Sequence, residues 1–192
     1  MDIRTDHTDV LIIGAGMAGI RAAIEAADGD VNVTLVTKGA FCRDGAATWM
    51  AGEGYSVALY PPDSLEQQIK DTIKAGKFLN NQELVHNLIN LFPQTVDELV
   101  RWGVRYDKVD DRFRLHFIPG QTYTRSLSRK SGFLGAEYKR VLYRQVKRRK
   151  RIKVYEDLFI IDLLKSGNTV VGAVGLDIRE GEFIMILAKS TI

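Results

Sequence analysis

The chain has 192 residues, 45% of them hydrophobic and 27% charged, which is ordinary for a folded domain with its own core. Its net charge of +3 is too small to indicate an acidic partner, and no apolar run approaches the roughly 18 residues of a membrane span. The single cysteine, Cys42, excludes an internal disulfide and favours a reducing compartment. The three histidines lie far apart, so no metal site is predicted.

The first 36 residues alternate between strand and helix signals. Residues 1–9 are polar and predict a loosely held lead-in. The apolar run Asp9–Ile13 predicts a strand buried on both faces, and the alanine-rich segment Ala15–Ala27 predicts a helix. Val31–Val36 is a second apolar, β-branched run. This order predicts the start of a parallel α/β unit.

A mainly helical region is expected next. The pattern predicts helices over 64–76 and 81–102, with Ser64 or its neighbour Asp63 as the N-cap of the first. Pro93 marks a break or kink in the second helix.

The last third of the chain predicts a helix followed by strands. Residues 112–124 are expected to form a hairpin or loop, and 135–147 a basic helix. Runs at 154–164, 169–178 and 183–187 are separated by glycine-containing turns, which is typical of an antiparallel meander.

The strongest local motif is the turn between the first strand and the first helix, which has the spacing GxGxxG. Gly14 allows the tight turn, Gly16 lets the backbone approach a pyrophosphate, and Gly19 lets the helix pack close to the strand. The free N–H groups and the dipole at the helix start favour a phosphate there. A glycine turn in a nucleotide-free protein is the alternative, but the strand–turn–helix–strand context favours a dinucleotide site.

The end of the second predicted strand distinguishes between dinucleotides. NAD-binding proteins of this type place Asp or Glu about 20 residues after the glycines, to hold the ribose hydroxyl groups. Here Thr37 and Lys38 occupy that place, although Thr37 could simply end a strand. The missing carboxylate weakens the NAD interpretation and favours FAD.

Several segments, taken in order, resemble the flavoprotein subunits of succinate dehydrogenase and fumarate reductase, with L-aspartate oxidase and the adenylylsulfate reductase flavoprotein as relatives. The resemblance covers nearly the whole chain. The segments that carry it are Asp9–Gly19 with Arg21-Ala22-Ala23, Val36–Gly39, Thr48–Gly54, Asp71-Thr72, Glu98–Val104, Gly120–Arg125, Val171–Ala173 and Ala188-Lys189.

The resemblance implies a Rossmann-like FAD-binding domain with a parallel sheet, a helical insertion and an antiparallel β-meander. It implies that the pyrophosphate is held by Gly14, Gly16, Met17, Ala18 and Gly19. It places Thr37, Lys38 and Gly39 along the adenosine, the backbone of Ile160 at the adenine edge, and Thr48, Gly52 and Gly54 near the isoalloxazine ring. For Thr48 and Gly54 an ordinary loop is the alternative.

Two departures from the family pattern affect chemistry and substrate. Respiratory members carry a histidine before the flavin loop that binds FAD covalently, whereas this chain has Asp44-Gly45-Ala46-Ala47 there, so we expect non-covalent FAD. Gln121 replaces the usual histidine of a "GHS" element, and Glu53 interrupts the "QGG" of the loop. These differences leave the substrate open.

The resemblance also implies the extent of the domain and its partners. Residues 1–192 are expected to be the N-terminal portion of an FAD-binding domain: a dinucleotide-binding βαβ and flavin loop over 1–60, a helical insertion over 61–130, and a helix plus meander over 131–192. The capping domain and the catalytic residues would lie beyond it, so no catalytic residue is assigned.

The implied activity is a flavin-dependent oxidoreductase acting on a small dicarboxylate in the full-length protein. L-aspartate oxidase and a binding module without catalysis of its own are the alternatives. An iron–sulfur subunit is an expected partner. The expected location is cytoplasmic, at most peripheral on the inner face of a membrane through partner subunits.

The segment Lys139–Lys153 carries nine basic residues and no acid. A solvated helix face explains it best, a surface for an acidic partner is second, and nucleic acid is the least favoured because few aromatic residues interleave. We therefore expect no nucleic-acid binding.

Overall fold

The computed structural model describes residues 3–43, 47–52, 55–129 and 134–192. The contacts between residues divide the chain into two compact units. The first unit combines Met1–Trp49 with Tyr138–Ile192, and the second is Met50–Glu137.

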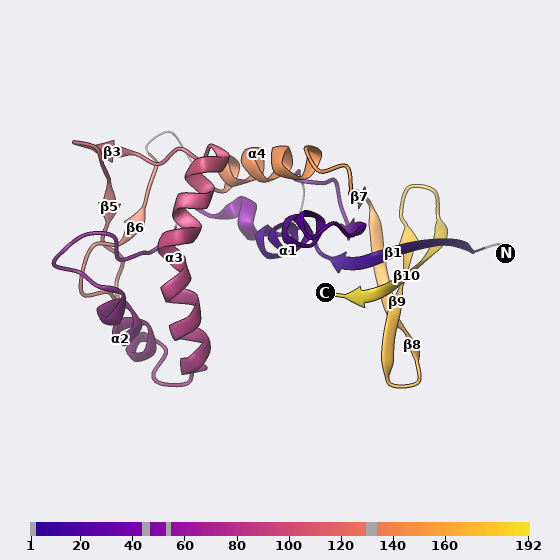
Figure 1. The fold of residues 1–192 in the computed structure, drawn as a ribbon, viewed down its shortest axis with the longest axis horizontal. Helices are drawn as coiled ribbons and strands as arrows, with labels where there is room; N and C mark the ends of the chain where they lie inside the picture. The colour runs from indigo at the N-terminus through magenta and orange to yellow at the C-terminus, as the bar shows by residue number, and fades with distance from the viewer. Residues whose placement is uncertain (1–2, 44–46, 53–54, 130–133) are drawn as a thin grey trace. The chain divides into compact units, whose positions relative to one another are not determined.

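A six-stranded mixed sheet lies in the first unit (Figure 1). Its strands follow the order β7-β2-β1-β10-β9-β8. Its strands are β1 (Arg4–Ile13), β2 (Val33–Val36), β7 (Ile152–Tyr155), β8 (Leu158–Ser166), β9 (Thr169–Asp177) and β10 (Glu182–Thr191). β7, β2, β1 and β10 are parallel neighbours, whereas β10, β9 and β8 are antiparallel. The predicted α/β fold with a parallel sheet and an antiparallel meander is confirmed.

The first strand is longer than the sequence predicts. The expected lead-in is wrong for Arg4–Thr8, because these residues pair in parallel with Ile184–Ala188 of β10. Backbone pairing to a distant strand, rather than apolar side chains, holds this half of β1. The polar side chains remain at least partly exposed, so the sequence here lacks the apolar pattern that would predict a strand.

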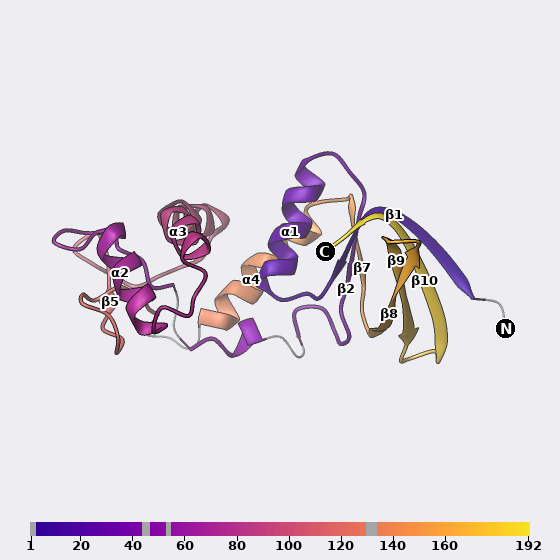
Figure 2. The same ribbon diagram turned by 90° about the horizontal axis from the view of Figure 1, so that it is seen from below.

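Helix α1 (Met17–Asp28) connects β1 to β2 and completes the predicted strand–turn–helix–strand unit (Figure 2). Ile20, Ala23 and Ile24 are buried on one face of the helix. Their spacing of three and four residues gives the apolar stripe by which a helix packs on a sheet. β1 and β2 are in register from Val10↔Val33 to Ile13↔Val36, so their carboxyl ends lie side by side.

The predicted strand over 154–164 is two strands. Asp157, with φ of 55°, lies between β7 and β8 and turns the chain, so that β7 joins β2 while β8 joins β9. The core of the sheet consists of Leu11, Val36, Leu158, Ala173, Ile184 and Ile186, all at most 1% exposed. Burial of these side chains is the main stabilising contribution to the sheet.

The second unit contains two of the predicted helices, α2 (Leu65–Ala75) and α3 (Gln82–Trp102). The Ser64 side chain accepts a hydrogen bond from the Gln67 N–H at 3.1 Å, which confirms Ser64 as N-cap. α3 runs without interruption through Pro93.

Short elements complete the chain: η1 (Ala47–Met50), the hairpin β3 (Lys108–Val109) with β4 (Arg112–Phe113), and the pair β5 (Leu115–His116) with β6 (Ser126–Leu127). The predicted basic helix is α4 (Leu134–Lys147).

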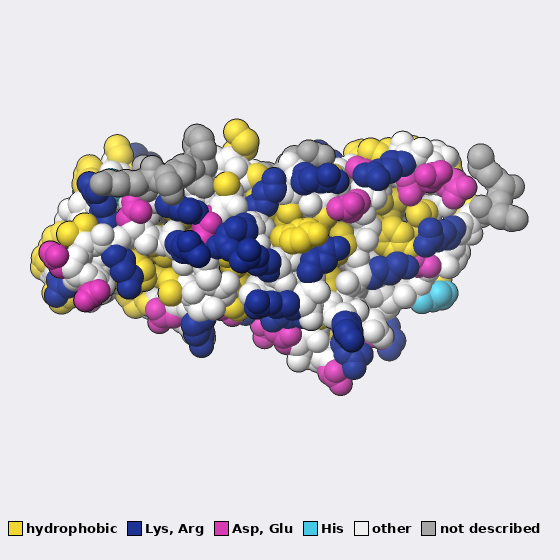
Figure 3. Space-filling view, turned by 90° about the horizontal axis from the view of Figure 1, so that it is seen from above, with side chains coloured by type: hydrophobic (Ala, Val, Ile, Leu, Met, Phe, Trp, Pro, Cys, Tyr) yellow, Lys and Arg dark blue, Asp and Glu magenta, His cyan; other side chains and the backbone are white. Residues whose placement is uncertain are grey.

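Basic side chains gather on the surface that Figure 3 shows. Three cations of the segment Lys139–Lys153 have acidic partners in the first unit: Arg149 pairs with Asp28 at 2.7 Å, Arg151 with Asp30 at 2.7 Å, and Lys153 with Asp6 at 2.8 Å. The segment is therefore partly neutralised by the unit's own acids.

Candidate functional site: a glycine-lined cavity

Gly14, at the end of β1, is the first element of the cavity. Its φ is 112°, in the region that favours glycine, and its N–H donates to the Val36 carbonyl at 2.9 Å. A Cβ on Gly19 would lie 1.9 Å from the Gly14 carbonyl oxygen, so the helix can approach the turn only if residue 19 is glycine. Gly14 and Gly19 therefore have the turn and packing roles that the motif predicts.

The N-terminus of α1 begins at Gly16, which has no side chain to cap it. The Met17 N–H instead donates to the Thr48 hydroxyl of η1 at 3.1 Å. Among the described residues, a Cβ on Gly16 would meet only that hydroxyl, at 3.8 Å, so these residues leave the space in front of the helix start open. Helix N-termini of this kind bind anions through their N–H groups and dipole.

The wall beside the glycine turn is made where β2 ends. The Thr37 N–H donates to the Tyr155 carbonyl at 2.9 Å, and the Thr37 carbonyl accepts from the Leu158 N–H at 3.1 Å. The Asp157 N–H reaches the Gly39 carbonyl at 3.4 Å. Residues 37–39 and the first residues of β8 are thus one continuous surface.

These segments enclose a cavity of about 710 Å³ in the first unit. It is lined by Ile13, Gly14, Ala15, Gly16, Met17, Ala18, Val36, Thr37, Lys38, Gly39, Ala47, Thr48, Leu158, Phe159 and Ile160. The volume lies within the range of about 300–1,000 Å³ that is typical of ligand and cofactor sites.

Most of the predicted site residues meet in this cavity. Gly19 does not line it and instead packs against the turn. Gly52 belongs to the second unit, and Gly54 lies outside the described residues. The sequence analysis missed Phe159, although the apolar run after Asp157 could have indicated it.

The residues fit a dinucleotide better than an isolated phosphate. A glycine-lined helix start lies at one part of the cavity, and the ends of β2 and β8 extend it. Among the residues that the structure describes, no carboxylate lines the cavity, in contrast to the usual NAD-type site.

Cys42 lies in the loop that follows Gly39 and is 4% exposed. Burial raises the pKa of its thiol to about 12, with nearby Lys139 opposing the rise and Glu156 adding to it. The Glu156 carboxylate accepts the Phe41 N–H at 2.9 Å and fixes the same loop. A protonated, buried thiol favours a packing role for Cys42.

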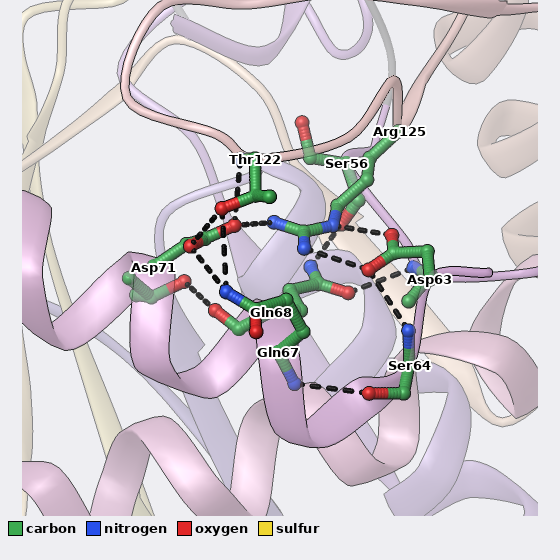
Figure 4. Close-up of polar contacts among 10 residues, drawn as sticks. Ser56, Asp63, Ser64, Gln67, Gln68, Asp71, Thr122 and Arg125 are labelled. Atoms are coloured by element: carbon green, nitrogen blue, oxygen red, sulfur yellow. Dashed lines mark hydrogen bonds and ion pairs between the residues drawn. The ribbon is translucent and has the colours of Figure 1, made fainter.

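A buried ionic cluster organises the second unit (Figure 4). Arg125, 1% exposed, donates to both carboxylate oxygens of Asp63, at 2.6 and 2.8 Å, and to Asp71 at 2.6 Å. Burial by itself raises the pKa of Asp71, but hydrogen bonds from Thr122, Arg125 and Gln67 outweigh burial and hold that pKa at about 2. Asp71 is therefore ionised at neutral pH, and against the opposing effect of burial its hydrogen bond and that of Asp63 raise the pKa of Arg125.

Residues near the same cluster also hold residues 56–58, which follow the Thr48–Gly54 segment in the sequence. The Gln68 amide donates to the Ser56 carbonyl at 2.6 Å and accepts the Ala58 N–H at 2.8 Å (Figure 4). The Val57 N–H donates to the Arg125 carbonyl at 3.1 Å. Residues 56–58 are thus hydrogen-bonded both to α2, through Gln68, and to the backbone of Arg125.

The described residues form neither a cluster of metal ligands nor a membrane-spanning helix. No group of three potential metal ligands occurs among residues 3–43, 47–52, 55–129 and 134–192. Within the same ranges, no helix is both long and apolar enough to cross a bilayer.

Comparisons with known proteins agree with the geometry of the cavity. Residues 9–192 match the family described as FAD binding domain. The fumarate reductase (CoM/CoB) of Methanothermobacter marburgensis has one subunit that is 35% identical, over 100% of this chain and 35% of its own length. L-aspartate oxidase of Clostridium acetobutylicum is 32% identical, over 97% of this chain and 42% of its own length.

A solved structure gives the same result for the fold. The apo Sdh1 complex of Mycobacterium smegmatis superposes with a TM-score of 0.92 at 31% identity, covering 98% of this chain and 34% of that one. The chain thus spans between 34% and 42% of the length of these three proteins. From the family match, supported by the glycine turn and the cavity, we conclude that the chain belongs to the FAD binding domain family.

Proposed function

We propose that the cavity of the first unit binds FAD without a covalent bond. The single observation that carries this proposal is that one cavity is lined both by the open, glycine-containing start of α1 and by the end of β2. Gly14, Gly16, Met17 and Ala18 would hold the pyrophosphate, and Thr37, Lys38 and Gly39 would lie along the adenosine. When bound, the flavin supplies hydride chemistry that these side chains do not have.

Adenine would be recognised at the edge of the sheet. β8 is the edge strand, and its Leu158 N–H points away from β9, toward the Thr37 carbonyl. Backbone groups two residues apart point to the same side of a strand, so the N–H and C=O of Ile160 face that edge as well. They form a donor and acceptor pair suited to the polar edge of adenine.

The flavin ring would be approached by Thr48, Gly52 and Gly54. This part of the proposal rests on the resemblance of Thr48–Gly54 to the flavin loop of the family. The absence of a histidine between His7 and His86 supports non-covalent binding, since histidine is the residue that bears the covalent link in respiratory members.

The proposed activity of the full-length protein is flavin-dependent oxidation or reduction of a small dicarboxylate. The similarity to a fumarate reductase subunit supports this activity, and an iron–sulfur subunit is a proposed partner. L-aspartate oxidase is the second candidate, supported by a similarity of nearly equal identity. A binding module without catalysis of its own is the alternative from another class.

Titration of the purified protein with FAD tests the binding proposal. We expect a shift of the flavin absorbance bands, and we expect acid denaturation to release all the flavin. A protein that never perturbs the FAD spectrum contradicts the proposal. Flavin that stays on the denatured polypeptide contradicts only the non-covalent part.

Substrate assays on the full-length protein separate the two enzymes. Reduction of the bound flavin by succinate, or oxidation of the reduced flavin by fumarate, would support the dicarboxylate activity. Flavin reduction by L-aspartate with formation of hydrogen peroxide under air would support the oxidase. Binding of FAD with neither reaction would leave the binding module.

A further inference from the structure

Phe159 is an exposed aromatic residue in the wall of the cavity. It lies on the edge strand β8 and is 51% exposed. Its neighbours behave differently: Leu158 is 1% exposed in the core, and Ile160 packs against that core. Because side chains alternate along a strand, the ring of Phe159 projects from the opposite face. Phe159 lines the cavity, so its exposed ring is accessible to a ligand bound there.

The nucleoside end of the proposed cofactor reaches this residue. Phosphates at the start of α1 leave the adenosine to extend over the end of β2. There, the hydrogen bonds from Asp157 and Leu158 join β8 to Thr37 and Gly39. Gly39, Leu158 and Phe159 all line this one cavity.

In bound FAD, the polar edge of adenine and the flat face of adenine would contact different residues of β8. The backbone of Ile160 faces the free edge of the strand and would meet the polar edge of adenine. A base bound by its edge leaves its two faces to be covered by side chains from either side of the sheet. The Phe159 ring projects on one of those sides, and an aromatic ring on the face of a base is a favourable contact.

We propose that the Phe159 side chain covers one face of the adenine ring and makes the site selective for adenine nucleotides over flavin mononucleotide. This inference rests on the proposed FAD function. It assigns a distinct share of the affinity to the adenine half of the cofactor, so ADP alone is a ligand of the same cavity.

The test compares Phe159→Ala and Phe159→Tyr with Ile161→Ala as a matched control. Ile161 is 52% exposed on the same strand and does not line the cavity. We measure the Kd for ADP by calorimetry and for FAD and FMN by flavin fluorescence, together with the thermal midpoint. Phe159→Ala should weaken ADP and FAD about tenfold, equivalent to about 1.4 kcal/mol, and leave FMN unchanged. Phe159→Tyr and Ile161→Ala should stay within about twofold of the parent protein.

Each outcome decides the proposal. ADP and FAD affinities that are unchanged in Phe159→Ala overturn it, as does an equal loss in Ile161→Ala. A loss for FMN equal to that for FAD also overturns it, since FMN has no adenine. If the parent protein binds neither FAD nor ADP, the proposed function itself fails, which a separate titration of the parent shows.

Discussion

Two glycines of one motif should respond to alanine in opposite ways. Gly16 and Gly19 are three residues apart, yet a methyl group has different surroundings at each. At Gly19 it would lie 1.9 Å from the Gly14 carbonyl oxygen, about 1.5 Å closer than the 3.4 Å at which ordinary contact begins (3.4 − 1.9). At Gly16 it would lie 3.8 Å from the Thr48 hydroxyl, which is ordinary contact.

The expected magnitudes follow from these distances. Overpacking against backbone costs about 3 kcal/mol at its upper end, and the helix preference for alanine returns up to about 1 kcal/mol, so Gly19→Ala should lose about 2 kcal/mol. For a chain of this size that corresponds to a fall of about 4–8 °C in Tm. Gly16→Ala should stay within about 2 °C. Its methyl group would stand where the phosphate approaches, so FAD affinity should fall about tenfold.

Differential scanning fluorimetry without FAD and a fluorescence titration with FAD measure the two quantities. The division of roles would be refuted if Gly16→Ala lowered Tm as much as Gly19→Ala. Parent-like FAD binding by Gly16→Ala would refute the assignment of the helix start to the pyrophosphate.

Three further predictions concern single side chains. Thr48→Val removes the acceptor of the Met17 N–H and should cost about 1 kcal/mol in urea unfolding, which Thr48→Ser should restore. Because the folded-state pKa of Asp71 is lowered to about 2, its contribution of about 2 kcal/mol is complete above about pH 4 and is lost as pH falls toward 2. Asp71→Asn should therefore flatten unfolding free energy against pH in that window, and curves parallel to the parent's would contradict this reasoning. Arg125→Met should cost about 3–5 kcal/mol by leaving two buried carboxylates unpaired, and a loss below about 1 kcal/mol would show that the ionic cluster is dispensable.

Local signals explain what the sequence predicts well. The glycine turn, helix α1 and the Ser64 cap each depend on residues within a few positions of one another, so they can be predicted from the local sequence without knowledge of tertiary contacts. Thr37 and Lys38 are located by their spacing from the glycines, whereas Gly39 and Ile160 are identified only through family resemblance, because no local pattern connects segments about 120 residues apart.

Long-range pairing explains what the sequence does not predict. The polar half of β1 has no strand-like pattern and depends on β10 for its backbone partners. The Arg125 cluster joins residues 54 and 62 positions apart, and although Asp71 and Arg125 both belong to segments that resemble the family, nothing in the sequence indicates that they pair. The division of β7 from β8 depends on a single positive φ at Asp157, a conformation that a non-glycine residue seldom adopts.

The pairing of β1 with β10 has a consequence for biosynthesis. Arg4 pairs with Ile184, so 180 residues (184 − 4) must be synthesised before the first half of β1 meets its partner. At about 5–20 residues per second, the ribosome needs about 9–36 s to supply them. During that interval one edge of β1 lacks its partner β10 and is open to pairing with other chains. The nascent protein should therefore depend on chaperones that shield an early strand edge, and slower translation should increase its aggregation.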